Sequence, residues 1–324
     1  MIKDIVLICD DNYCMPTAVC IKSITDNAHI EVPVLIHVCT FGLTNENVAL
    51  LEGLSTLNYK IVVDVFNPTI ISGKLTQVIA KSHVTQSALI KFELPNIFHN
   101  IDSLLYIDSD IIINSDINEL VSIEIEEYYL AASYEFWKHV AKMKFTFKHD
   151  VDKDFYFNSG VMLMNLRKMR EDKISEKLWY FKLNQAKTEL MDQESLNYVC
   201  REAIYHLPVK WNFNPAFLHN DFIKEINIVY KTTYSSVENM LADARIIHYV
   251  GKGDKPWVYK SARMRNLWDK EYDTIFHEKL QLKDEIDSSE RRDSSKIKKI
   301  VNDFGFTGLF CYIVYRLKQL LKWK

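Results

Sequence analysis

Short apolar runs alternate with amphipathic stretches through the first hundred residues of the chain. The first run, IVLIC at 5–9, is apolar on both faces, which is typical of a central parallel strand covered by helices on both sides. Together the runs predict strands at residues 5–9, 32–39, 60–66 and 104–107. The stretches between them predict helices at 16–27, after an N-cap at Thr44, and at 84–97. This alternation indicates parallel βαβ units and therefore an α/β protein.

The second half of the chain has a less regular pattern. Its apolar runs predict strands at 129–133, 161–166, 203–208 and 245–250, and helical patterns cover 168–187 and 192–202. The segment 210–217, KWNFNPAF, has too many aromatic, Asn and Pro residues for a regular element. The segment 283–295, KDEIDSSERRDSS, is charged and polar, so we expect a linker there and a main domain at residues 1–282.

The composition favours a large globular domain without a nucleic-acid partner. With 324 residues, 48% of them hydrophobic, the chain can form a sizeable core. The formal net charge of -3 gives no overall attraction to polyanions. The six cysteines have no CxxC or metal-finger spacing, which favours a reducing, cytoplasmic setting. No apolar run reaches the roughly 20 residues that a membrane-spanning helix needs.

Two aspartates interrupt the apolar segment LLYIDSDIIIN at residues 104–114. Side chains at positions i and i+2 of a strand face the same side, so Asp108 and Asp110 can project together from the strand's carboxyl end. Ligands bind at that end of open α/β sheets. Two neighbouring carboxylates repel each other unless a cation lies between them, which favours a divalent metal site. The alternative is a turn with two solvated aspartates.

Three further segments place polar residues in apolar surroundings. FNSGVMLMNL (157–166) begins with polar residues just before an expected strand, MDQESL (191–196) has two of them at a helix start, and IIHYVGKGDKPW (246–257) contains the end of a strand and the loop after it. His248 ends that strand, and its alternative role is that of a core histidine. In this order the motifs resemble glycosyltransferase family 8, the retaining nucleotide-sugar transferases, over roughly residues 3–270.

The resemblance implies a GT-A fold, with a Rossmann-like half and a mixed central sheet, and a UDP-sugar donor held through a metal. It assigns Asp108, Asp110 and His248 as metal ligands. Oxygen ligands with one imidazole suit Mn²⁺, with Mg²⁺ as the alternative. The donor-binding residues that the resemblance implies are Cys9, Asp10, Asn12, Tyr13, His83, Lys91, Ser109, Asn158, Ser159, Gly160, Gly251 and Lys255.

Some of these donor-binding assignments have alternatives. Asp10 or Asp11 would also serve as a helix N-cap, and His83 would also serve as a surface histidine. Lys91 stands where the family usually has arginine, so the charge is kept but the bidentate fork is lost. In the segment 210–217, Trp211 and Phe213 belong either to an acceptor cleft or to the core.

The resemblance places the catalytic residues at Gln193 and Asp192. Gln193 would lie beneath the anomeric carbon and Asp192 would bind sugar hydroxyls. Because an amide is a poor nucleophile, we favour attack on the same face from which UDP leaves. The expected reaction is retaining transfer of galactose or glucose from a UDP-sugar to a saccharide of lipopolysaccharide or another bacterial surface glycan. The alternatives are a catalytically silent UDP-sugar-binding scaffold and a glycogenin-like self-glycosylating primer.

The segment 296–324 differs in character from the rest of the chain. It carries seven Lys or Arg residues against one acid, Asp303, and its apolar residues fall on helical faces. Its apolar centre is too short to span a bilayer but suits a helix lying in the interface of an anionic membrane. We therefore expect a peripheral enzyme on the inner face of the cytoplasmic membrane with a lipid-linked saccharide acceptor. The alternative is a helix docked on the body or on a partner subunit.

Overall fold

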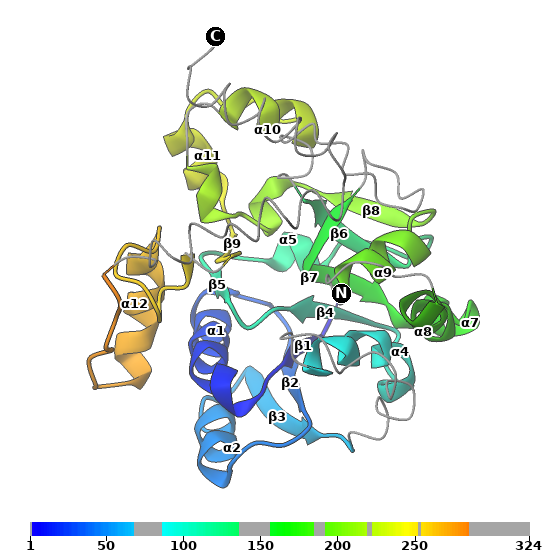
Figure 1. Cartoon of the computed structure of the whole chain (residues 1–324), viewed down its shortest axis with the longest axis horizontal. Helices are drawn as coiled ribbons and strands as arrows, with labels where there is room; N and C mark the ends of the chain where they lie inside the picture. Colours follow the sequence, from blue (N-terminus) through cyan, green and yellow to red (C-terminus); the bar gives the residue numbers. More distant parts are fainter. Residues whose placement is uncertain are drawn as a thin grey trace.

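The computed structural model of the chain describes residues 2–67, 86–135, 156–184, 192–218, 222–251 and 254–284. Within them, a seven-stranded sheet with the order β3-β2-β1-β4-β7-β6-β8 forms the centre (Figure 1). A two-stranded sheet joins β5 to β9. The strands are β1 (Asp4–Ile8), β2 (Val34–Thr40), β3 (Tyr59–Val65), β4 (Ser103–Ile107), β5 (Ile111–Ile113), β6 (Leu130–Tyr134), β7 (Phe157–Asn165), β8 (Ile204–Leu207) and β9 (Ile246–His248).

The first four predicted strands are confirmed, and they are parallel. β1 pairs with β2 and β4, and β2 pairs with β3. One face of these strands packs against α1 (Cys14–Asn27) and α2 (Asn45–Glu52), and the other face of β1, β2 and β4 packs against the segment 86–98. This two-sided burial explains why the central strand β1 is apolar on both faces. Thr44 caps α2 as predicted, because its side chain accepts a hydrogen bond from the Asn47 amide.

The other half of the sheet contains antiparallel pairs, so the sheet is mixed. β7 runs antiparallel to both β4 and β6, while β8 is parallel to β6. β7 begins at Phe157, four residues before the predicted start, and all of its residues are buried. Asn158, Ser159 and Gly160 therefore lie inside the strand and not before it, because their polar groups find partners there.

Two predicted helices are each divided in the structure. The predicted helix at 84–97 is a 3-10 helix, η3 (Gln86–Phe92), followed by α4 (Leu94–Ile97), whose first turn contains Pro95. The predicted helix at 168–187 is α7 (Leu166–Glu171) and α8 (Ile174–Asn184), separated at Lys173, whose φ of 53° ends the first helix. The predicted helix at 192–202 is α9 (Gln193–Val199).

The remaining helices were not predicted from the sequence. They are η1 (Asp11–Tyr13), α5 (Asn118–Val121), η4 (Val209–Trp211), η5 (Pro215–Phe217), α10 (Ile223–Tyr230), α11 (Val237–Asp243) and α12 (Arg265–Ile275). Trp211 and Phe213 are both buried, which matches the core alternative for these aromatic residues.

The main domain continues to Lys283, where the expected linker begins. The amide of Lys283 donates to the Val258 carbonyl at 2.9 Å, and its carbonyl accepts from Lys260 at 3.0 Å. From residue 285 onward the linker and the segment 296–324 lie outside the described residues. No helix among the described residues has the length and hydropathy needed to cross a membrane.

A buried ion cluster joins the first three strands. His37 on β2 is 7% exposed, and its Nδ1 lies 2.7 Å from Asp64 of β3 while its Nε2 lies 3.5 Å from Asp4 of β1. Burial lowers the pKa of His37, but the interactions with Asp4 and Asp64 outweigh it and raise the pKa to about 9. The imidazolium therefore helps to hold the three strands together.

We expect the cluster to make the protein less stable at alkaline pH. Because the pKa of His37 rises from 6.5 to about 9 on folding, its contribution is complete below pH 6.5 and disappears as the pH passes 9. The shift corresponds to about 3 kcal/mol. Urea unfolding between pH 6 and 10 should show this loss in the wild type and much less of it in His37→Gln. Equal pH slopes for both proteins would contradict the assignment.

Candidate active site

The pair Asp108 and Asp110 lies where the chain passes from the large sheet to the small one. β4 ends at Ile107 and β5 begins at Ile111, so the segment 108–110 is the connection between them. β1 and β4 are parallel neighbours, although the chain continues from β1 to β2 on the other side. This is a topological switch point, where open α/β sheets bind ligands. Ser109 fixes the connection, since its hydroxyl donates to the Ile8 carbonyl at 3.0 Å.

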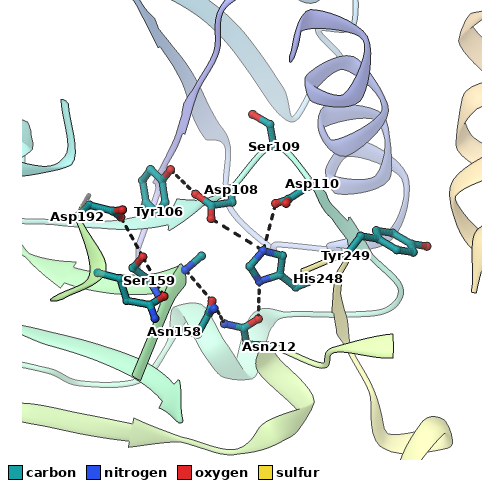
Figure 2. Close-up of polar contacts among 12 residues, drawn as sticks. Tyr106, Asp108, Ser109, Asp110, Asn158, Ser159, Asp192, Asn212, His248 and Tyr249 are labelled. Atoms are coloured by element: carbon teal, nitrogen blue, oxygen red, sulfur yellow. Dashed lines mark hydrogen bonds and ion pairs between the residues drawn. The ribbon is translucent and has the colours of Figure 1, made fainter. Parts of the chain in front are cut away.

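His248 comes to this connection from the small sheet. It is the last residue of β9 and pairs with Ile111 of β5. Its Nε2 lies 3.1 Å from Oδ1 of Asp110 and 3.9 Å from Oδ2 of Asp108, and the three side chains converge (Figure 2). One ligand atom from each residue lies within 4.8 Å of the others. The structure thus brings the three predicted metal ligands together.

The properties of these side chains fit a divalent cation. Oδ1 of Asp110 is buried and has no hydrogen-bond donor among the described residues. A buried carboxylate oxygen without a donor is costly, and a bound cation would satisfy it. Two carboxylates and one imidazole suit Mn²⁺ or a similar metal.

Gly160 leaves room for the side chains of His248 and Asp108. A Cβ atom at this position would lie 2.2 Å from Cε1 of His248 and 2.9 Å from Oδ2 of Asp108. The amide of Asp108 also donates to the Gly160 carbonyl at 2.8 Å. The strand β7 therefore supports the site through its backbone, and a residue with a side chain would displace the histidine ring.

Lys91 lies between the predicted metal ligands and the predicted catalytic residues, since it contacts both Asp108 and Asp192. Its Nζ lies 3.1 Å from Oδ1 of Asp108 and 2.7 Å from Oδ2 of Asp192. Burial lowers the pKa of Lys91, but the two carboxylates outweigh it and hold the pKa above its ordinary value. Burial would raise the pKa of Asp192, yet Lys91 and the Ser159 hydroxyl keep it below its ordinary value. Both groups are therefore charged near neutral pH.

Lys255 is a second lysine beside the carboxylates. Its Nζ forms an ion pair with Oδ2 of Asp110 and donates to the Tyr249 carbonyl at 2.8 Å. Although burial opposes the charged form, Lys255 and His248 hold the pKa of Asp110 well below its usual range. The Nζ also lies 5.4 Å from the centre of the Trp257 ring. Gly251 precedes this loop with a φ of 92°, which favours glycine.

The loop between β1 and α1 carries four of the predicted donor-binding residues. Cys9 is buried, and Asp10 caps η1 by accepting from the Tyr13 amide at 3.1 Å, as its alternative role predicted. Asn12 is exposed. Tyr13 is 40% exposed, and its ring meets the ring of Trp257 edge-on with 6.1 Å between the ring centres. The loop 9–13 therefore lies next to the loop that contains Lys255. His83 lies outside the described residues.

The predicted catalytic glutamine is held at both ends of its amide. Oε1 of Gln193 accepts from the Ser159 amide at 3.1 Å, and Nε2 donates to Oε2 of Glu135 at 3.3 Å. Its neighbour Asp192 accepts from the Ser159 hydroxyl at 2.9 Å. The N-terminus of α9 is therefore fixed against β7, beside the carboxylate cluster.

Three residues of the site were not predicted from the sequence. Tyr106 donates to Oδ1 of Asp108 at 2.6 Å, Glu135 accepts from Gln193, and Asn212 contacts Nδ1 of His248 at 2.9 Å. The sequence around Glu135 does not mark it as a site residue, because a glutamate after an apolar strand is common. Asn212 lies between two core aromatic residues, so its polarity was the available signal.

The fold and the site together define a glycosyltransferase of the GT-A type. The model of the family Glycosyl transferase family 8 matches residues 4–261, and the chain belongs to this family. It is similar to General stress protein A of Bacillus subtilis (strain 168), with 27% identity over 264 residues, 79% of this chain and 87% of that protein.

Two further similarities concern proteins whose names describe sugar transfer. Lipopolysaccharide 1,2-glucosyltransferase of Escherichia coli is 27% identical over 255 residues, which are 76% of this chain and 71% of that protein. The galactosyltransferase LgtC, solved in complex with donor and acceptor sugar analogues, aligns with a TM-score of 0.63 and 22% identity. That alignment covers 84% of this chain and 95% of LgtC, and it supports the fold.

Proposed function

We propose that this family 8 enzyme transfers a hexose, galactose or glucose, from a UDP-sugar to a saccharide acceptor with retention of the anomeric configuration. The observation that carries the proposal is the convergence of Asp108, Asp110 and His248 at the switch point, beside Gln193 and Asp192. The similarity to a lipopolysaccharide glucosyltransferase supports a surface-glycan acceptor.

The charges of the site suit a nucleotide diphosphate bound through a cation. Asp108, Asp110 and His248 would hold Mn²⁺, with Mg²⁺ as the alternative. The chemistry that such a cation supplies is Lewis-acid neutralisation of charge on the leaving diphosphate. Lys255 would add a point charge at the same diphosphate, and the loop 9–13 would hold the uridine beside Tyr13.

The sugar would lie against β7 and the start of α9. Asp192 would bind its hydroxyl groups while Lys91 keeps that carboxylate ionised. Gln193 would face the anomeric carbon, where its carbonyl dipole stabilises the positive charge that develops as the UDP bond breaks. The acceptor hydroxyl would then attack from the face that UDP leaves and give its proton to a departing phosphate oxygen.

A screen of UDP-sugars tests the proposal. Purified full-length protein is incubated with each donor, with Mn²⁺ or with a chelator, and released UDP is measured with and without saccharide acceptors. We expect Mn²⁺-dependent UDP release from one or two UDP-hexoses and an α-linked product. Label that accumulates on the protein itself would favour the self-glycosylating primer, and no turnover of any donor would favour the silent scaffold.

The segment 296–324 is the part of the proposal that concerns localisation. Its excess of basic residues over a short apolar centre supports a contact with the anionic inner face of the cytoplasmic membrane. The full chain should sediment with anionic vesicles more than with neutral ones, and a chain that ends at Ser295 should not. Equal sedimentation of the two chains would count against a membrane role for this segment.

A further inference from the structure

A chain of side-chain hydrogen bonds runs from His248 away from the carboxylates. Nδ1 of His248 lies 2.9 Å from Oδ1 of Asn212, and Nδ2 of Asn212 donates to Oδ1 of Asn158 at 2.9 Å. Nδ2 of Asn158 donates to Oε2 of Glu135 at 2.9 Å. Figure 2 shows Asn212 between the histidine ring and Asn158. We infer that Asn212 is a positioning residue that fixes the tautomer of His248 and so presents its Nε2 to a metal.

One backbone group determines which side chain donates and which accepts along this series of hydrogen bonds. The amide of Gly160 donates to Oδ1 of Asn158 at 2.9 Å, and a backbone N–H is always a donor. The oxygen of Asn158 therefore faces Gly160 and Asn212, which requires the NH₂ group of Asn212 to point toward Asn158. The oxygen of Asn212 must then face His248.

The position of the ring proton follows in turn. An amide oxygen only accepts hydrogen bonds, so Nδ1 of His248 carries the proton that Asn212 receives. In the neutral ring, Nε2 then has a free electron pair. Nε2 lies 3.1 Å from Oδ1 of Asp110, and this oxygen has no donor within the described residues. Two electron-pair donors this close are favourable only with a metal cation or a second ring proton between them.

The far end of this series of hydrogen bonds is the carboxyl group of Glu135, which also contacts the predicted catalytic glutamine. Oε2 of Glu135 accepts from Asn158 and, at 3.3 Å, from Nε2 of Gln193. Metal-binding histidines commonly donate their second nitrogen to a carboxylate or carbonyl, which fixes the ring and strengthens the ligand. Here two amides separate the histidine from the carboxylate, and successive hydrogen bonds in a buried chain polarise one another. Glu135 thereby joins the orientation of His248 to that of Gln193.

The first test compares two substitutions at Asn212 whose side chains branch at Cγ as asparagine does. Asn212→Asp keeps an oxygen that accepts from Nδ1, whereas Asn212→Leu removes it. Mn²⁺ affinity is measured by calorimetry or by electron paramagnetic resonance, without nucleotide sugar. We expect Asn212→Leu to weaken Mn²⁺ binding about 10- to 100-fold, as for other residues that orient metal ligands, and Asn212→Asp to keep most of the affinity. Equal losses in both variants, or no loss in Asn212→Leu, would overturn the inference.

The second test uses the metal-free wild-type protein and does not depend on any variant of Asn212 folding. Long-range ¹H–¹⁵N correlation spectra, recorded at a pH where the ring is neutral, distinguish the protonated ring nitrogen from the unprotonated one. The signals of His248 are those missing from His248→Gln. We expect a proton on Nδ1, and a proton on Nε2 would overturn the inference.

The inference rests on the proposed metal-dependent function, but the two can fail separately. If the wild type binds no Mn²⁺ while Nδ1 is protonated, the proposed cation is wrong and the positioning role of Asn212 stands. If Mn²⁺ binds tightly and Nε2 is the protonated nitrogen of the metal-free ring, the positioning role is wrong and the proposed function stands.

Discussion

Replacing Asp110 by asparagine should lower the rate of sugar transfer at saturating Mn²⁺ about a thousandfold or more. Asp110 offers the buried oxygen that lacks a donor, and His248 lies beside it at 3.1 Å. An asparagine amide keeps the shape of the side chain but loses the charge that attracts a cation. A metal acting as Lewis acid contributes several kcal/mol, and each 1.36 kcal/mol corresponds to a factor of ten in rate.

The same substitution should also destabilise the metal-free protein. Asp110→Asn leaves the largely buried ammonium group of Lys255 without its ion-pair partner, and breaking a buried pair costs about 3 kcal/mol. Transfer rates, Mn²⁺ affinity and urea unfolding are measured side by side. Asp102→Asn is the matched control, since Asp102 lies just before the amino end of β4, away from the connection that carries Asp110, and its side chain is 75% exposed. Near-normal transfer by Asp110→Asn in chelator-treated buffer would rule out the metal role.

Replacing Gln193 by alanine should lower kcat about 10²- to 10³-fold and change donor affinity little. Its carbonyl dipole is expected to act on charge that develops only as the UDP bond breaks, so its loss raises the barrier without weakening the ground state. The amide is fixed by Ser159 and Glu135, which means that little reorganisation accompanies the reaction.

Steady-state kinetics and calorimetry with the donor separate these two effects. Gln281→Ala is the control, because Gln281 is an exposed glutamine remote from the site in sequence. A rise in KM with unchanged kcat would make Gln193 a binding residue. Inversion at the anomeric carbon of the product would contradict the proposed stereochemistry.

The parallel half of the sheet could be predicted because its signals are local. Each strand is a short, largely apolar run next to a helical pattern, and Thr44 marks a helix start by its own side chain. The division of the predicted helix at Lys173 depends on one positive φ, which no residue type announces. The early start of β7 depends on partners such as Glu135 for Asn158, and these partners are distant in the sequence.

The candidate site shows the same contrast between local and distant signals. Asp108 and Asp110 could be predicted because two carboxylates next to a strand are unusual within a short window. His248 was predicted through the order of motifs that the family shares. Glu135 and Asn212 could not be predicted, since their roles arise from contacts with Gln193 and His248, which lie 58 and 36 positions away.

The position of a bound metal tests the central claim most directly. Crystals of the full chain grown with Mn²⁺ and UDP are measured at the manganese absorption edge, and the anomalous difference map locates the metal. We expect one strong peak within bonding distance of Asp108, Asp110 and Nε2 of His248, at about 2.0–2.3 Å. A peak elsewhere, or bound UDP with no peak at these three residues, would contradict the account.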